Sequence, residues 1–201
     1  MPSFLSYISY KGKKYETGVS PPVAELYEPL TDLSGDYIST MLELGNKKSK
    51  STRRIFKDDF ERMGIVHTSI DWNGEDRALK LDLRKPLNLG KFDMVTNIGT
   101  TEHVDIQEPA WRNIHNSLKV GGIFISTTPY PKERYYIHHG IWYPQVSFFE
   151  RFASLNDYII DKLYVVGKTG ARMVFCRMGK KSEKEFVMPE HNLIIKHHQI
   201  L

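Results

Sequence analysis

Residues 92–104, FDMVTNIGTTEHV, give the clearest indication of the fold. The first part, Phe92–Asn97, is an apolar run of strand length, and Gly99 follows as a turn signal. The next apolar segment is LKVGGIFISTTP, residues 118–129, where Ile123–Thr127 is a predicted strand that Pro129 ends. Two buried strands separated by about one helix length predict a parallel β-α-β unit.

The residues between these strands supply the helix. Ala110, Trp111, Ile114 and Leu118 recur at helical spacing and indicate one buried face. Lys119 and the pair Gly121–Gly122 then predict a C-terminal stop.

Three shorter apolar runs precede residue 92, and each is a predicted strand followed by turn residues. They are Met41–Leu44 before Gly45, Ile65–Ile70 before Asp71, and Leu79–Leu83 before Pro86. Between the first two, Ser51 is placed to cap a helix that runs to about Met63, with Gly64 as its stop.

The chain after residue 129 continues the pattern. Pro144 is the expected first residue of a helix that turns Phe148, Phe149, Phe152 and Leu155 inward. Tyr158–Val166 and Ala171–Met178 are predicted strands of a hairpin. Five strands with helical crossovers and a terminal hairpin predict an α/β open sheet whose first five strands are parallel, with one antiparallel strand added by the hairpin.

This pattern divides the chain into three parts. Residues 1–39 are predicted to be an N-terminal extension or cap with a short helix around Pro22–Tyr27, and residues 40–178 the main domain. Residues 179–201 are predicted to form a charged C-terminal tail, in which Leu193–Ile195 is a candidate edge strand.

Composition favours one domain with extensions and a reducing environment. The chain has 201 residues, a formal net charge of +4 and a single cysteine, Cys176, which lies in an apolar run and is expected to be buried. No intramolecular disulfide can form. The start lacks a signal-peptide pattern, and no window reaches the ~20 apolar residues of a membrane helix, so we expect a cytoplasmic protein with no membrane partner.

The residues that follow each strand are the candidate site, because ligands of open α/β sheets bind beyond the carboxyl ends of the strands. A glycine there lets the backbone approach a ligand, and a carboxylate can accept hydrogen bonds from both hydroxyls of a ribose. An aromatic residue beside that carboxylate can face the base. The residues at these places are Glu43, Gly45 and Asn46; Asp71 and Trp72; Asp82 and Leu83; and Asn97, Ile98 and Gly99.

Residues 92–104 and 118–129 resemble the S-adenosylmethionine-dependent methyltransferases with the Rossmann-like fold, in which the fourth strand often ends in Glu-His-Val. The resemblance covers about Thr40 to Met178 and implies a three-layer α/β/α fold around a mostly parallel twisted sheet. It implies that Glu43 and Gly45 begin the first cofactor motif, that Asp71 binds the ribose, and that Asp82 with Leu83 contacts the adenine. It places residues 97–99 near the methionine part of S-adenosylmethionine, whose product is S-adenosylhomocysteine.

One departure from that family lies in the first motif. Further glycines usually follow Gly45 there, whereas this chain has Asn46–Lys47–Lys48. Lys47 or Lys48 is instead a candidate partner for the cofactor carboxylate.

The acceptor side is predicted from residues after the fourth and fifth strands. His103 is the candidate general base because its pKa range suits proton removal from an oxygen or nitrogen nucleophile. Candidate substrate contacts are Glu102, Tyr130, His138, Trp142 and Tyr143, and no metal site is predicted. The predicted reaction is methylation of a small-molecule O or N acceptor by a monomer or homodimer.

Three other functions are alternatives to the methylation of a small molecule. A non-catalytic regulatory module would explain the glycine-poor first motif. RNA-directed methylation would use Lys47, Lys48, Lys50, Arg53 and Arg54, although nucleic acid is the less favoured partner. A nicotinamide-dependent dehydrogenase expects G-x-G-x-x-G after the first strand, and GNKKSK at residues 45–50 does not match it.

Overall fold

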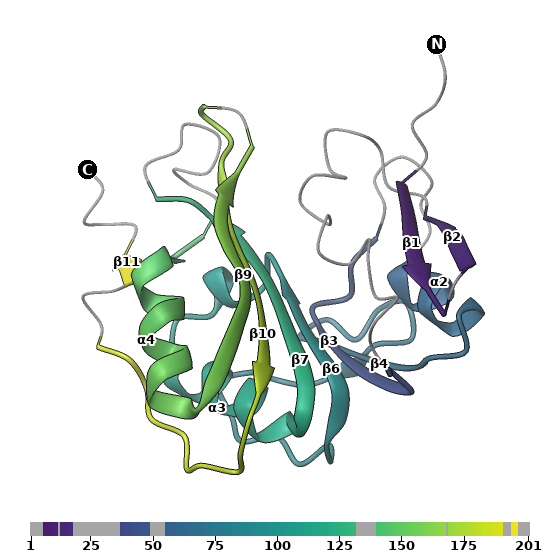
Figure 1. Cartoon of the computed structure of the whole chain (residues 1–201), viewed down its shortest axis with the longest axis horizontal. Coiled ribbons are helices and arrows are strands. Elements are labelled where there is room, and N and C mark those ends of the chain that lie inside the picture. The colour runs from purple at the N-terminus through teal and green to yellow at the C-terminus, as the bar shows by residue number, and fades with distance from the viewer. Residues whose placement is uncertain are drawn as a thin grey trace.

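The computed structural model describes residues 6–11, 13–17, 37–48, 55–131, 140–167, 169–190 and 194–196. Figure 1 shows strands and helices alternating along the chain. The strands are β1 (Ser6–Tyr10), β2 (Lys13–Thr17), β3 (Thr40–Leu44), β4 (Val66–Asp71), β5 (Leu79–Lys80), β6 (Phe92–Ile98), β7 (Leu118–Pro129), β8 (Trp142–Pro144), β9 (Tyr158–Val166), β10 (Met173–Lys180) and β11 (Ile194–Lys196). The helices are α2 (Phe56–Arg62), the 3₁₀ turn η2 (Thr101–His103), α3 (Gln107–Ser117) and α4 (Val146–Asn156).

One mixed sheet organises the described residues. Its strand order is β5-β4-β3-β6-β7-β10-β9. The first five strands along this order are parallel, and β10 is antiparallel to both β7 and β9. The predicted α/β sheet with one antiparallel strand from the terminal hairpin is confirmed, and the order reverses direction at β3, which is a topological switch point.

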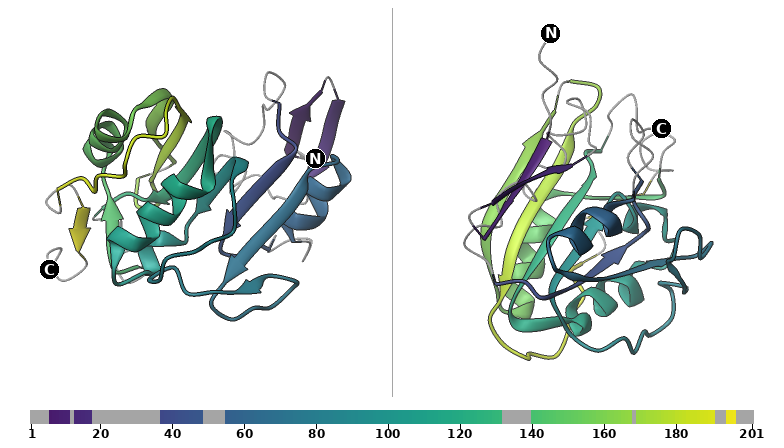
Figure 2. Two further views of the ribbon diagram at one scale, coloured as in Figure 1. Left: turned by 90° about the horizontal axis from the view of Figure 1, so that it is seen from below. Right: turned by 90° about the vertical axis from the view of Figure 1, so that its right-hand side faces the viewer.

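Successive side chains along each strand point to opposite faces of the sheet and so contribute to two apolar cores, one on each face. Leu42, Val95 and Phe124 turn to the face covered by α3 and α4. Met41, Met94 and Ile125, each the sequence neighbour of one of these, pack under α2 with Phe56 and Phe60. Figure 2 shows the helices on the two sides of the sheet, which is the expected three-layer arrangement.

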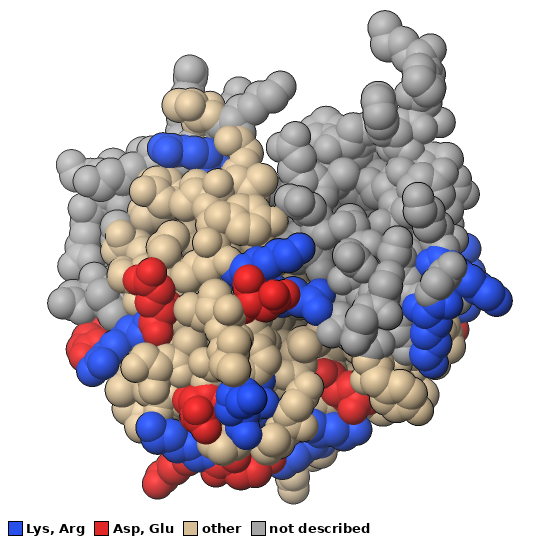
Figure 3. All heavy atoms as spheres, viewed as in Figure 1, with Lys and Arg blue, Asp and Glu red and all other residues tan. Residues whose placement is uncertain are grey.

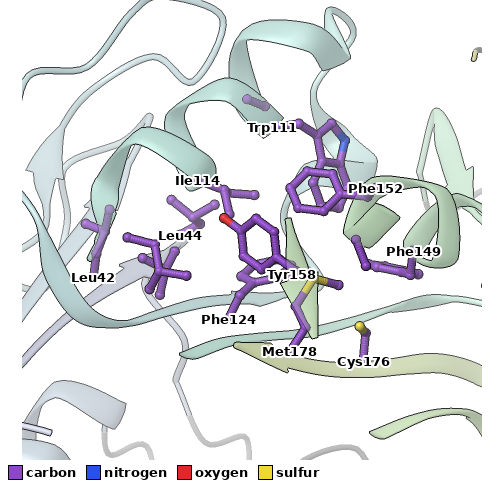
Figure 4. Close-up of a cluster of buried hydrophobic side chains, with 14 of the residues drawn as sticks. Leu42, Leu44, Trp111, Ile114, Phe124, Phe149, Phe152, Tyr158, Cys176 and Met178 are labelled. Atoms are coloured by element: carbon purple, nitrogen blue, oxygen red, sulfur yellow. The ribbon is translucent and has the colours of Figure 1, made fainter. Parts of the chain in front are cut away.

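The core under α3 and α4 is mainly aromatic. Trp111 of α3 is fully buried, with Phe148 at 4.7 Å and Phe152 at 5.6 Å between ring centroids. Figure 4 shows Trp111 and Phe152 side by side above the strands that carry Phe124 and Cys176. Cys176 is buried and free, as predicted, and burial raises the pKa of its thiol, so it is no nucleophile in this state.

The third predicted strand is shorter than expected. Only Leu79–Lys80 pairs in the sheet, whereas residues 79–83 were predicted. The physical reason lies at Asp82, whose Oδ1 accepts the backbone N–H of Arg84 at 3.0 Å and turns the chain. Leu83 then enters the core instead of extending the strand.

Two predicted helix boundaries were also wrong. Helix α3 ends at Ser117, and Gly121–Gly122 belong to β7, where a Cβ on Gly122 would lie 2.9 Å from the Asp93 carbonyl oxygen. This glycine therefore serves a close approach of two strands and is not a helix stop. Pro144 ends β8, and the extended residue Gln145 precedes α4, which begins at Val146.

The segments outside the main sheet form two further strand pairs. β1 and β2 make an antiparallel hairpin in the N-terminal extension, and β11 pairs with β8 and not with the main sheet. The helix predicted around Pro22–Tyr27 lies outside the described residues. The segment after β10 was expected to be a charged tail, yet its Phe186 is buried in the core. None of the described helices has the length and apolar character needed to span a membrane.

Candidate functional site

The carboxyl ends of β3 and β4 are tied together by Asp71. Its Oδ2 accepts the backbone N–H of Asn46 at 3.1 Å, and its Oδ1 accepts the N–H of Asn73 at 3.2 Å. The Asn46 side-chain amide donates to the Glu75 carbonyl at 2.9 Å. Asp71 is partly exposed, so its carboxylate faces solvent with further acceptor positions on both oxygens.

The residues beside Asp71 differ in what they offer a ligand. Trp72 is 80% exposed, which leaves its ring open to a stacking partner. Asp82 is held by Arg84, whose Nε and Nη2 donate to both carboxylate oxygens and keep the pKa of Asp82 at about 2. Leu83 is buried in the core. The structure thus brings Asp71 and Trp72 to the surface, whereas the oxygens of Asp82 already have donors.

Glu43 lies buried between two strands. Its Oε2 is 3.3 Å from Nε2 of His67, and its Oε1 accepts the N–H of Lys47 at 3.2 Å. Burial raises the pKa of Glu43, and hydrogen bonding to His67 opposes that shift. His67 was not among the predicted residues. It lies two positions before Ser69, the register partner of Glu43, so only the strand pairing reveals that it shares a face with Glu43.

The loop after β3 is pressed against the loop after β6. Gly45 has φ +74°, and a Cβ there would lie 2.4 Å from Oγ1 of Thr100, so glycine is required. The same hydroxyl donates to the Leu44 carbonyl at 2.7 Å. Lys47 reaches across and donates from Nζ to the Gly99 carbonyl, also at 2.7 Å. The sequence pattern did not predict a role for Thr100, because its role depends on the tertiary contact with Gly45.

Asn97 and Ile98 lie at the end of β6 but face the interior. The Asn97 amide donates to Thr101 Oγ1 at 2.8 Å and to Ser126 Oγ at 3.0 Å, and its Oδ1 accepts the Thr101 N–H. Ile98 packs in the core under α2. The Asn97 side chain therefore holds the start of η2 in place, Ile98 belongs to the core, and Gly99 is the one of these three residues that lies at the candidate site.

η2 carries a buried acid next to an exposed histidine. Glu102 is fully buried, and a Cβ on Gly140 would lie 2.9 Å from its Cγ, so the chain after β7 packs directly on it. The Ile141 N–H donates to the Glu102 carbonyl at 2.7 Å. His103, the next residue, is exposed. Glu102 is thus buried, whereas its neighbour His103 is exposed to solvent.

The stability of the protein should depend on pH through Glu102. Burial raises the pKa of Glu102 from 4.5 to about 7, against the opposing charge of Lys47. Because the folded state holds this proton more tightly than the unfolded state, the free energy of unfolding falls as pH rises through that window. We expect Glu102→Gln to remove a loss of about 3 kcal/mol between pH 4.5 and 7.5, measured by urea unfolding. Equal losses in both proteins would contradict this assignment.

The predicted substrate residues after β7 are partly structural. The Tyr143 hydroxyl is buried and lies 3.2 Å from both the N–H and the carbonyl oxygen of Gly140. Trp142 donates from Nε1 to the Asp105 carbonyl at 3.0 Å. Tyr130 is partly buried, with the Arg172 guanidinium 4.7 Å above its ring. His138 lies outside the described residues.

The charges near the site are largely paired within the protein. Lys48 contacts Asp76 at 2.9 Å, and Lys47 donates to Gly99 as above. The other three residues of the RNA-binding hypothesis, Lys50, Arg53 and Arg54, lie outside the described residues. Figure 3 shows basic and acidic side chains interspersed along the lower half of one face. No cluster of three or more metal-ligating side chains occurs among the described residues.

The strand order and the position of these residues together define a class. A mostly parallel sheet whose last hairpin inserts one antiparallel strand next to β7, with an acid directly after β4, is the Rossmann-like fold of the class I S-adenosylmethionine-dependent methyltransferases.

Sequence comparison agrees with this class. Residues 31–126 match the family model described as a methyltransferase domain. This part of the chain therefore resembles a methyltransferase domain, and the fold is the one that solved methyltransferases with bound S-adenosylhomocysteine share. A search of curated proteins by sequence found no match.

Solved structures share the fold at low sequence identity. A 1,6-didemethyltoxoflavin N1-methyltransferase of Burkholderia thailandensis, bound to 1,6-didemethyltoxoflavin and S-adenosylhomocysteine, has a TM-score of 0.55 and 14% identity, over 81% of this chain and 77% of that one. The N-methyltransferase NodS of Bradyrhizobium japonicum, with S-adenosylhomocysteine, has a TM-score of 0.52 and 14% identity over 75% and 82%. An O-methyltransferase of a polyketide synthase from Brevibacillus brevis has a TM-score of 0.52 and 12% identity over 78% and 70%.

The residues present fit one end of S-adenosylmethionine and not the other. The partly exposed carboxylate of Asp71 and the exposed ring of Trp72 suit a ribose and a base. At the other end of the site, the ammonium of Lys47 already donates a hydrogen bond to the Gly99 carbonyl. The amino-acid part of S-adenosylmethionine carries an ammonium and a carboxylate, and in this conformation Lys47 takes the Gly99 carbonyl as an acceptor in place of that ammonium.

Proposed function

We propose that this chain binds S-adenosylmethionine over the ends of β4, β3 and β6 and transfers its methyl group to an oxygen or nitrogen of a small molecule. The observation that carries the proposal is Asp71. It ends the strand beside the switch point, and among the described residues each of its oxygens accepts one backbone N–H. A carboxylate so held is fixed in orientation and keeps acceptor capacity for two adjacent hydroxyls.

The roles of the neighbouring residues follow from their positions. Trp72 offers an exposed stacking face for the base, and Leu83, which follows β5, is the apolar residue proposed to lie next to the base. Gly45 packs closely against Thr100, which keeps the loop after β3 near the ends of the strands. A ligand can then lie across those ends. When bound, S-adenosylmethionine supplies an activated methyl group, and the protein has to align an acceptor with it and exclude water.

The small size of the proposed acceptor is supported by the fold relatives and by the segment after β7. The Burkholderia enzyme holds the small heterocycle 1,6-didemethyltoxoflavin. In this chain, residues 140–144 are fastened to η2 and Asp105 by hydrogen bonds from Ile141 and Trp142. A wall fixed in this way beside His103 favours a compact acceptor, which Tyr130 and Trp142 would contact with their rings.

His103 is proposed to take the proton of the acceptor. It is exposed at η2, directly after the buried Glu102, and an imidazole suits proton removal near neutral pH. The acceptor nucleophile must lose its proton during transfer, so removing a general base lowers turnover and leaves ligand affinity unchanged.

The test is transfer of labelled methyl from S-adenosylmethionine to a panel of phenols, catechols and nitrogen heterocycles. With the best acceptor of that panel, we expect His103→Asn to lower kcat about 100-fold or more at pH 7. The dissociation constant for S-adenosylhomocysteine should stay within about threefold of the wild-type value, because His103 is not a proposed cofactor ligand. Full turnover of His103→Asn across pH at saturating acceptor would exclude His103 as base. Label transfer to none of the panel by protein that binds S-adenosylhomocysteine would contradict a small-molecule acceptor.

A further inference from the structure

Lys47 holds an unusual place at the centre of the candidate site. Its Nζ donates to the Gly99 carbonyl at 2.7 Å, and its backbone N–H is held by the buried carboxylate of Glu43. The position of a Cβ on Gly99 would be 3.1 Å from Oε1 of Glu102 and 3.7 Å from Nζ of Lys47. The ammonium therefore lies beside a backbone acceptor, with the buried acids Glu43 and Glu102 nearby.

The strand order shows what part of a nucleoside would meet this ammonium. The order β5-β4-β3-β6 places the loop of Asp82 and Leu83 on one side of Asp71, and Lys47 with Gly99 on the other. With a ribose at Asp71 and its base toward Trp72 and Leu83, the substituent on the 5′ carbon points the opposite way. It would run across the end of β3 toward Gly99.

That substituent carries a competing cation in S-adenosylmethionine and S-adenosylhomocysteine. Both end in an amino acid that carries an ammonium and a carboxylate. The carboxylate was the expected partner of Lys47, but in the structure the Lys47 ammonium takes the Gly99 carbonyl, which is an oxygen acceptor that the ligand's own ammonium would seek. Two ammonium groups repel each other and cannot donate to the same position. The side chain of Lys47 thus imitates the amino-acid end of the cofactor.

The surrounding contacts favour this closed arrangement. The loop of Gly45 is pressed against Thr100, whose hydroxyl donates to the Leu44 carbonyl at 2.7 Å. This brings the backbone of Lys47 within reach of Gly99 and lets the lysine span the gap between the two loops. Lys48, the next residue, points elsewhere and contacts Asp76.

We propose that Lys47 is an internal competitor that occupies the subsite for the amino-acid end of the cofactor, so that the chain binds a bare 5′-thionucleoside more readily than one that carries an amino acid. This inference rests on the proposed function, because it takes the nucleoside to lie at Asp71. Cofactor binding then requires Lys47 to leave the Gly99 carbonyl.

The test compares two ligands and three proteins by isothermal titration calorimetry. The ligands are S-adenosylhomocysteine and 5′-methylthioadenosine, which lacks the amino acid. The proteins are the wild type, Lys47→Ala and the matched control Lys162→Ala, which changes an exposed lysine on β9 at the opposite edge of the sheet. Lys47→Met keeps the aliphatic stem without the charge and replaces the alanine variant if that variant unfolds.

We expect the wild type to bind S-adenosylhomocysteine no more tightly than 5′-methylthioadenosine. Lys47→Ala should tighten binding of S-adenosylhomocysteine about tenfold or more, which corresponds to one charge-assisted hydrogen bond returned to the ligand. Lys47→Ala should change the binding of 5′-methylthioadenosine by less than about threefold, and Lys162→Ala should change the binding of neither ligand.

Two results would overturn the inference, and they differ in what they leave standing. If the wild type prefers S-adenosylhomocysteine and Lys47→Ala weakens or does not change that binding, Lys47 is not a competitor, while the proposed function stands. If neither ligand binds any of the folded proteins, the nucleoside site itself is absent, and the proposed function falls with the inference.

Discussion

Trp111→Ala should lower the free energy of unfolding by about 3–5 kcal/mol, the range for removing a fully buried large aromatic side chain. Trp111 is fully buried and contacts the rings of Phe124, Phe148, Phe149 and Phe152. Its loss leaves a cavity at the junction of α3, α4 and the sheet, which none of these rings can fill without leaving its own position.

Trp111 also links the core to the candidate site. Its Nε1 donates to Gln107 Oε1 at 2.8 Å, and the Gln107 amide donates to the Thr101 carbonyl at 2.7 Å. Trp111→Phe keeps most of the apolar volume but removes the donor to Gln107. We therefore expect it to cost less than half as much as Trp111→Ala. Urea unfolding followed by circular dichroism measures both, and a loss under about 1 kcal/mol for Trp111→Ala would contradict the assigned role.

Lys180→Met should cost about 2–4 kcal/mol, because a buried ammonium group would no longer satisfy the end of a helix. The Lys180 side chain is fully buried, and its Nζ donates to the carbonyls of His115 and Leu118 at 2.9 and 3.1 Å. These carbonyls end α3 and point their negative dipole at the lysine. A third bond at 3.1 Å joins it to Glu183.

The matched control is Lys91→Met. Lys91 contacts the same Glu183 carboxylate at 2.5 Å, but its side chain is substantially exposed. An exposed ion pair contributes under about 1 kcal/mol, so the control should change the free energy of unfolding by less than that amount. Equal effects of the two substitutions in urea unfolding would show that the carbonyl contacts of Lys180 do not stabilise the protein.

Much of the fold could be predicted because local chemistry and tertiary structure agree. The apolar runs that become β3 and β6 are followed by Gly45 and Gly99, which turn the chain with positive φ. Asp71 ends β4 and accepts the N–H of Asn73 in the turn that follows. The errors occur where a side chain interacts with the backbone. Asp82 ends the third strand through the N–H of Arg84, and no apolar pattern contains that bond.

The candidate site could be located from the sequence, but its connections could not. Asp71 and Glu43 were placed because they adjoin strand ends. The contact of Lys47 with Gly99 joins residues 52 positions apart, and the pairing of Glu43 with His67 depends on strand register. Such contacts are set by the packing of loops and strands, which a pattern along one chain does not encode.

The most direct test of the proposed nucleoside site at Asp71 is titration with 5′-methylthioadenosine and S-adenosylhomocysteine. The proteins titrated are the wild type, Asp71→Asn and Asp161→Asn. Asp161 is a matched control, since it is an exposed aspartate on β9 at the opposite edge of the sheet, paired with Arg177. We expect saturable binding of at least one ligand by the wild type. Asp71→Asn should lose about 30-fold or more in affinity, because two charge-assisted hydrogen bonds are lost, and Asp161→Asn should bind as the wild type does. Undiminished binding by Asp71→Asn, or no binding of either ligand by the folded wild type, would contradict the proposed site.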